Sequence, residues 1–101
     1  MNPEKIISFK TISPFFEMCR DGEKPFDIRR ADSKDSRFRA LFQVRYKLHP
    51  GWAIRFTNPA TGESFLRWLD GWDYLTDQDH LAIQPAWLIL YLGGVVSEVQ
   101  S

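Results

Sequence analysis

The sequence has little of what builds disulfide-bonded, metal-binding or membrane-spanning proteins. Cys19 is the single cysteine, and with two histidines the chain offers no plausible set of zinc ligands. No apolar run approaches the roughly 18 residues of a membrane span, and the start of the chain does not resemble a signal peptide. We therefore expect a cytoplasmic protein without metal, cofactor or membrane partner. We also expect Cys19 to be a core residue, with a nucleophilic role as the less favoured alternative.

Basic residues are absent from the last third of the chain. All 13 lysines and arginines lie within residues 1–67 together with eight acids, whereas residues 68–101 hold five acids and no base. Basic density is greatest between Arg20 and Lys47, with nine bases and five acids. Such asymmetry can create a face that attracts anions, and a merely solvated surface is an equal alternative. A chain without net charge is not suited to coating long duplex DNA.

The first part of the chain predicts a strand, a short helix and a second strand. The β-branched and aromatic residues of Ile6–Ile12 favour a strand. Ser13 is a good N-cap for a helix over Pro14–Asp21, and Gly22 suits the left-handed position after a helix. Helical spacing predicts one buried stripe of Phe15, Met18 and Cys19. The second strand is expected over Pro25–Arg30.

The stretch Arg37–Lys47 fits two structures. Its apolar positions 38, 41, 42 and 46 have helical spacing, whereas positions 42, 44 and 46 alternate as in a strand. We expect a polar loop over Ala31–Ser36 that continues to about Ala40, then a strand that ends at Lys47. A turn at His49–Gly51 follows.

The second half of the sequence predicts mostly strands. The expected elements are a hairpin of Trp52–Thr57 and Glu63–Leu69, a bend at Asp70–Gly71, a continued strand over Trp72–Leu75 and a helical turn within Thr76–Ala82. The apolar run Trp87–Leu92 predicts a central strand buried on both faces. A kink at Gly93–Gly94 then leads to a last strand over Val95–Val99. The 101 residues are thus predicted to form one α+β domain, a small mostly-β barrel of about six strands with one or two short helices.

The stretch Gly22–Arg30 reads G-x-K-x-x-[D/E]-x-R. Because strand residues alternate, Asp27 and Arg29 leave the same face of the sheet, and Lys24 lies just before them. This signature resembles that of the ASCH domains, a branch of the PUA-like superfamily. The order of elements over most of residues 6–99 is also similar, including a Thr-Gly hairpin at Ala60–Glu63. The chain looks most like the small single-domain ASCH-like proteins of bacteria and phages, which implies a PUA-like barrel.

The resemblance also implies a function, because ASCH-like and other PUA-like barrels are associated with RNA, modified bases or nucleosides. It implies an RNA- or nucleotide-binding module in which Lys24 and Arg29 contact phosphate oxygens or a base edge. Asp27 would accept a hydrogen bond from an exocyclic amine. The alternative is that Asp27 and Arg29 form only a structural salt bridge.

Three further residues are candidates for ligand binding. They are Trp52, Arg30 and Arg55. Trp52 can stack on a base, although packing in the core is the favoured role for each tryptophan.

Some ASCH-like proteins are amidohydrolases that act on acylated cytidine, through the signature lysine, a threonine three residues on and a distant glutamate. Lys24 matches the lysine, Asp27 occupies the threonine position, and Glu63, expected on a strand, is the candidate for the glutamate. A lysine that acts as a base or nucleophile must be neutral, whereas Asp27 favours the charged form. We therefore rank an enzyme below a binding module. A phage-like protein that modulates a host protein through its acidic last third is the other alternative.

Overall fold

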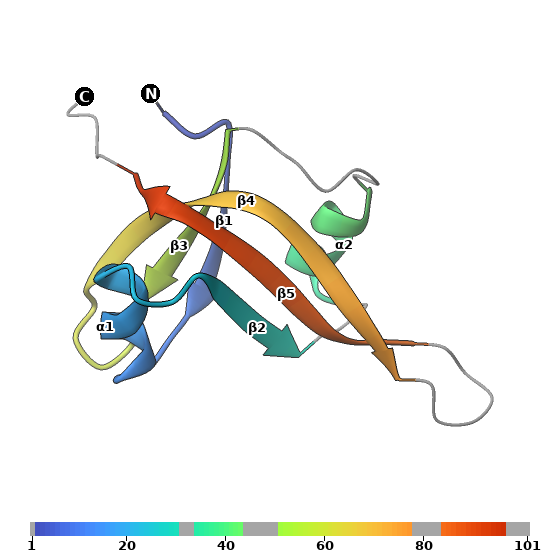
Figure 1. Ribbon diagram of the computed structural model, residues 1–101, viewed down its shortest axis with the longest axis horizontal. Coiled ribbons are helices and arrows are strands. Elements are labelled where there is room, and N and C mark those ends of the chain that lie inside the picture. The colour runs from blue at the N-terminus through green and yellow to red at the C-terminus, as the bar shows by residue number, and fades with distance from the viewer. Residues whose placement is uncertain (1, 31–33, 44–50, 78–83, 97–101) are drawn as a thin grey trace.

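The computed structural model describes residues 2–30, 34–43, 51–77 and 84–96. The elements follow in the order β1 (Lys5–Lys10), α1 (Phe15–Arg20), β2 (Phe26–Arg30), α2 (Ser36–Gln43), β3 (Trp52–Thr57), β4 (Ser64–Asp77) and β5 (Gln84–Val95). The strands form one sheet that curls into an open half barrel (Figure 1). The prediction of a mostly-β, barrel-like fold with two short helices is confirmed, although the described residues form five strands rather than about six.

The two edges of the sheet come from the first 30 residues. The strand order is β1-β3-β4-β5-β2, so β1 and β2 are the edge strands. β1 pairs in parallel with β3, and the other neighbours pair antiparallel. The hairpin predicted between Trp52–Thr57 and the next strand is confirmed, with Phe56 opposite Phe65. We call the space between β1 and β2 the seam.

The hydrophobic core fills the inside of the curl, and both helices contribute to it. Ile54 and Phe56 of β3, Phe16 of α1, Leu41 of α2 and Leu90 of β5 are all completely buried. They belong to one cluster with further apolar residues of β1 and β4. β1, β3 and β5 place alternate side chains in this core, as their pleat requires, whereas β2 contributes none.

β5 was expected to be buried on both faces, and this prediction is wrong. Leu88, Leu90 and Leu92 face the core, whereas Trp87 and Tyr91 are 42% and 43% exposed. The physical reason is that β5 is central in the strand order, but among the described residues the core cluster lies against one of its faces. β5 continues through Gly93 and Gly94 to Val95, so no separate last strand begins at Val95. The predicted kink at Gly93–Gly94 coincides with a register shift between the pairs Leu69–Leu92 and Arg67–Val95. Residues 97–99 lie outside the described residues.

The predicted cap of the first helix is wrong, and its predicted buried face is confirmed only for Cys19. The Ser13 hydroxyl donates to the Glu17 carboxylate (2.5 Å) and makes no capping hydrogen bond to the backbone. Phe16 is buried with Cys19, whereas Phe15 is half exposed, and the helix begins one residue later than expected. Gly22 has the predicted left-handed conformation, with φ of 82°.

Ser36–Gln43 is a helix, where a loop and then a strand were expected. Asp35 caps its start, since a carboxylate oxygen accepts the backbone N–H of Arg37 (2.9 Å). Phe38 and Leu41 are buried at helical spacing, so the helical reading of this stretch was the correct one. Residues 44–50, which include most of the predicted strand and the turn before Gly51, lie outside the described residues.

Thr76 and Asp77 end β4 and do not begin a helical turn. The strand runs for 14 residues, with register shifts at the predicted bend beside Asp70 and Gly71. Residues 78–82, the rest of the predicted helical turn, lie outside the described residues.

Candidate functional site

Two pockets lie along the seam. The α2-side pocket has a volume of about 580 Å³ and is lined by the ends of β1 and β2 and by the start of α2. The α1-side pocket has a volume of about 380 Å³, and its lining includes Ile12, Phe15 and Lys24. Lys10 and Arg29 line both pockets, so the two are neighbours along one charged seam.

β2 is the strand that makes the seam polar, because its inward face carries charges. Asp27 is 3% exposed, whereas its neighbours Phe26 and Ile28 are 43% and 48% exposed. Arg29 is half-buried on the same side as Asp27, as the alternation predicted. A buried carboxylate needs charged or hydrogen-bonding partners, and these come from the signature itself.

The structure brings the three signature residues together. A carboxylate oxygen of Asp27 lies 2.6 Å from Arg29 Nε, and the other lies 3.4 Å from Lys24 Nζ. Arg29 then crosses the seam and donates to the main-chain carbonyl of Lys10 (2.7 Å) and to the Thr11 hydroxyl (2.5 Å). The salt bridge that was weighed as an alternative is therefore present, and it holds Arg29 against the opposite edge of the half barrel.

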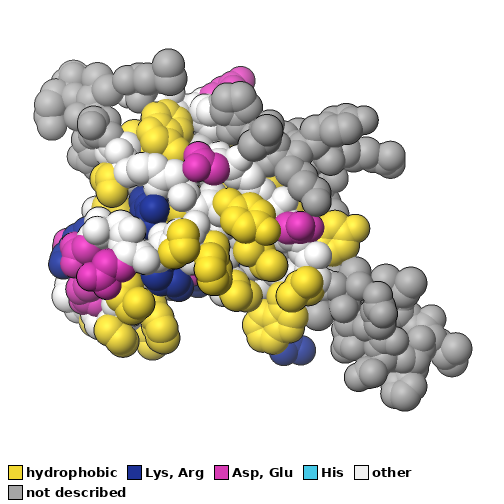
Figure 2. Space-filling model, in the orientation of Figure 1, with side chains coloured by type: hydrophobic (Ala, Val, Ile, Leu, Met, Phe, Trp, Pro, Cys, Tyr) yellow, Lys and Arg dark blue, Asp and Glu magenta, His cyan; other side chains and the backbone are white. Residues whose placement is uncertain are grey.

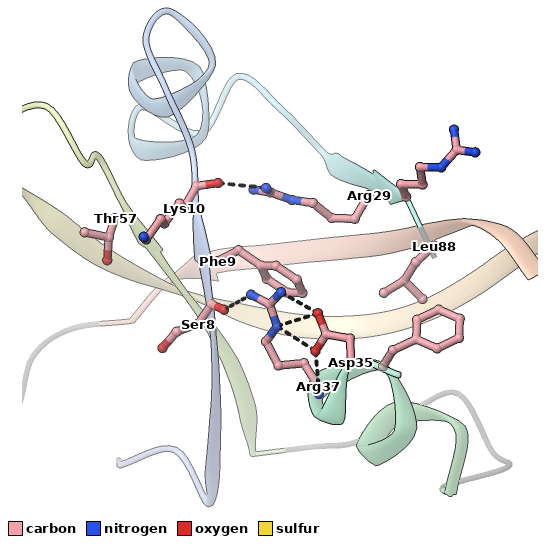
Figure 3. A pocket seen from close by; sticks show the side chains of 10 residues that line it. Ser8, Phe9, Lys10, Arg29, Asp35, Arg37, Thr57 and Leu88 are labelled. Carbon is pink, nitrogen blue, oxygen red and sulfur yellow. Dashed lines mark hydrogen bonds and ion pairs between the residues drawn. The ribbon is translucent and has the colours of Figure 1, made fainter. Parts of the chain in front are cut away.

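A second arginine crosses to β1 from the start of α2. Arg37 pairs with Asp35 and donates to the main-chain carbonyl of Ser8 (2.7 Å). The Phe9 ring lies between the two arginines, with its centroid 4.9 Å from Cζ of Arg29 and 4.4 Å from Cζ of Arg37 (Figure 3). Edge strands leave main-chain groups unpaired. The two guanidinium groups satisfy two such carbonyls, so that Arg29 links the two edge strands and Arg37 links α2 to β1.

The charge of the seam is mainly positive. Five cations line the two pockets and two carboxylates oppose them. The cations are Lys10, Lys24, Arg29, Arg30 and Arg37, and the acids are Asp27 and Asp35. A hydrogen bond from Arg37 lowers the pKa of Asp35 from 3.8 to about 2, so Asp35 is ionised at neutral pH. The excess of positive charge can attract an anion.

Two of the five cations have no acidic partner among the described residues. Lys10 is exposed on the edge of β1, and its ammonium makes no ion pair there. Arg30 is exposed at the end of β2, where its guanidinium lies 5.7 Å from the centroid of the Trp87 ring. These two side chains can meet a ligand without first breaking an ion pair.

Arg67 fixes the loop that carries Lys24. Its side chain is buried and donates to the main-chain carbonyls of Lys24 (2.6 Å), Gly93 (2.9 Å) and Cys19 (3.3 Å). Burial lowers the pKa of Arg67 and raises that of the fully buried Cys19 thiol. A neutral, enclosed thiol is suited to the core role expected for Cys19.

Two predicted site residues lie elsewhere. Trp52 packs against the core at the start of β3, under the ammonium of Lys5 (5.3 Å). Its partner in the β1 ladder is Lys5, five residues and so about 16 Å along the strand from Lys10. Arg55 donates to the Ser64 hydroxyl (3.3 Å) and lines neither pocket.

Glu63, the glutamate weighed for an amidohydrolase, precedes β4 in the turn and was wrongly expected on a strand. It pairs with Arg20 (3.2 Å) and lines neither pocket. It therefore does not supply the third group that Lys24 would need in that reaction.

Sequence reasoning missed half of the seam. Lys10, Asp35 and Arg37 were not candidates, because nothing in the local sequence says that β1 lies opposite β2. One signal was available for Arg37, since it lies in the basic block from Arg20 to Lys47.

No family model, curated protein or solved structure matches this chain. Within the part of the chain that the structure describes, no helix is long and apolar enough to cross a membrane. The same residues contain no cluster of three or more histidine, cysteine or acidic side chains that could hold a metal ion.

Proposed function

We propose that this protein binds single-stranded nucleic acid, in particular RNA, or a nucleotide, along the seam. The observation that carries the proposal is the pair of adjoining pockets with five cations and two acids between two edge strands. The fold is then a PUA-like barrel of the ASCH type, as the signature suggests. The volumes of about 580 and 380 Å³ suit one nucleotide each.

Each group in the seam has a separate task in this proposal. Lys10 and Arg30 contact phosphate oxygens, because neither must give up an acidic partner. Phe15 and Phe26, 50% and 43% exposed beside the α1-side pocket, offer apolar rings on which a base can stack. Asp27 positions Lys24 and Arg29 and does not read a base edge, since it is 3% exposed and faces these two cations.

The experiment compares Lys10→Ala with Arg55→Ala in the binding of a short fluorescent RNA, followed by polarisation at two salt concentrations. Both changes remove one exposed or half-buried cation from a strand, but Arg55 lies outside the pockets. A lost phosphate contact is worth about 1.5–3 kcal/mol, so Lys10→Ala is expected to weaken binding more than tenfold. The slope of the logarithm of its affinity against the logarithm of the salt concentration should become less steep by about one unit.

Arg55→Ala is expected to leave both quantities within experimental error. Lys24→Ala and Arg29→Ala are less informative, because either change also breaks an ion pair with the buried Asp27. Melting temperatures show whether a variant has lost stability as well as affinity. Wild-type protein that binds neither RNA nor a mononucleotide at low salt, or equal effects of Lys10→Ala and Arg55→Ala, would overturn the proposal.

A further inference from the structure

The outer face of β2, β5 and β4 is a contiguous apolar surface. The pairing register places outward-facing side chains in three rows. The rows are Phe26–Tyr91, Ile28–Ile89–Asp73 and Arg30–Trp87–Leu75. We call these residues the outer patch. Figure 2 shows hydrophobic side chains gathered on this face, over β5 and β2.

The apolar side chains of the outer patch are well exposed. Phe26, Ile28, Trp87, Tyr91 and Leu75 are each between 42% and 54% exposed. Single exposed apolar residues need no explanation, but a contiguous group of them marks an interaction surface. On β2 the patch overlaps the seam, because Phe26 and Ile28 also line the α1-side pocket and Arg30 lines the α2-side pocket. The seam does not explain the rest of the patch, since Trp87, Ile89, Tyr91 and Leu75 line neither pocket.

We propose that the outer patch binds a second copy of this chain, in a symmetric face-to-face dimer whose twofold axis runs parallel to β5. The inference goes beyond the proposed function and does not rest on it. Its basis is charge complementarity. Arg30 lies on the β2 flank of the patch, Asp73 lies on the β4 flank, and the β5 column between them is apolar.

A twofold axis along β5 exchanges the two flanks. β2 of one copy then faces β4 of the other, and Arg30 comes diagonally opposite Asp73 of the second copy, twice in each dimer. Ile89, Tyr91 and Trp87 meet their own counterparts along the axis. Sheets that pack in this way lie about 10 Å apart, which aromatic and long basic side chains can bridge.

The other in-plane axis is disfavoured by the same charges. A twofold axis perpendicular to β5 through the middle row would set β4 against β4 and Asp73 against Asp73. Two like charges directly opposite each other are destabilising. The position of Asp73 in the middle row therefore selects the parallel axis.

The size of the outer patch sets the expected affinity. A standard interface buries about 800 Å² on each partner, and three short rows on three strands supply less than this. We therefore expect a dissociation constant in the micromolar range. Sedimentation velocity over a series of protein concentrations measures it directly.

Charge exchange tests the pairing. Arg30→Asp and Asp73→Arg are each expected to weaken the dimer more than tenfold, and the double variant should restore most of the loss. Arg55→Asp, a charge reversal on β3 outside the patch, is the matched control and should leave the dimer unchanged. Ile89→Asp places a charge on the axis and should abolish dimerisation. Thermal melts monitor the fold of every variant.

The possible results separate this inference from the proposed function. Asp73 lines neither pocket, so Asp73→Arg is expected to lose the dimer without weakening RNA binding, and Lys10→Ala is expected to do the opposite. A wild-type protein that stays monomeric throughout the micromolar range overturns the inference. So does a dimer that survives Ile89→Asp, or a double charge exchange that restores nothing.

Discussion

β2 and β3 are both short alternating strands, but they bury opposite kinds of side chain. β3 buries Ile54 and Phe56 and leaves Arg55 partly exposed, whereas β2 buries Asp27 and exposes Phe26 and Ile28. β3 lies between two strands, with helices over its inner face. β2 is an edge strand, and its inner face meets the seam. Apolar burial therefore holds β3, while ion pairs and hydrogen bonds hold the inner face of β2.

The comparison also explains why one strand carries two surfaces. The charged side of β2 lines the pockets that we assign to an anionic ligand, and its apolar side is part of the outer patch. Neither side is committed to the core, so β2 is the element whose substitutions should separate stability, ligand binding and self-association.

The largest expected effect is the loss of stability on removal of a buried side chain of β3. Phe56→Ala removes a completely buried ring and should lower the free energy of unfolding by about 3–5 kcal/mol. Ile28→Ala, at a half-exposed site on β2, should change it by about 0.5 kcal/mol or less. Urea denaturation at protein concentrations well below the dissociation constant expected for the dimer measures both. Similar losses in the two variants would contradict the contrast between the strands.

The second effect tests the inner face of β2. Asp27→Ala leaves Lys24 and Arg29 without their buried carboxylate, and we expect a loss of about 3 kcal/mol. Asp21→Ala is the matched control, because Asp21 pairs with Arg20 at the exposed surface and should contribute less than about 1 kcal/mol. Equal urea midpoints for the two variants would mean that the Asp27 ion pairs do not hold β2.

The smallest effect concerns the second arginine of the seam. The pKa of Asp35 is about 2 in the folded protein and 3.8 ordinarily. This acid therefore contributes stability above pH 3.8, and the contribution disappears as the pH falls to about 2. Allowing for solvent screening of the partly exposed pair, we expect about 1 kcal/mol. Melting temperatures of wild type and Asp35→Asn should converge over this range, and a constant difference would exclude the assignment.

Much of the fold could be predicted from local patterns. Alternation predicted β1, β2 and β3, turn residues predicted the hairpin, and Gly22 ended the first helix. Two errors came from competing local signals. Asp35 begins a helix that was read as a loop and strand, and Ser13 uses its hydroxyl on Glu17 and not on the helix backbone.

The candidate site was predictable only in part. The spacing of Lys24, Asp27 and Arg29 on one strand was enough to place their charged groups together. The sequence also assigned Trp52 and Arg55 to this site, and only strand order and register show where these two residues lie. The register puts Trp52 at the far end of β1 from Lys10, and Arg55 lines neither pocket.

The sequence by itself determined that side chains of β2 alternate between two faces and that the charged groups of the signature lie together. Both follow from pleat and spacing, which are local properties of the chain. Only the tertiary structure decided which side of β2 faces inward. That choice depends on β1, whose edge carbonyls of Ser8 and Lys10 accept hydrogen bonds from Arg37 and Arg29. No local pattern encodes the meeting of two edge strands, since it results from the curl of the whole sheet.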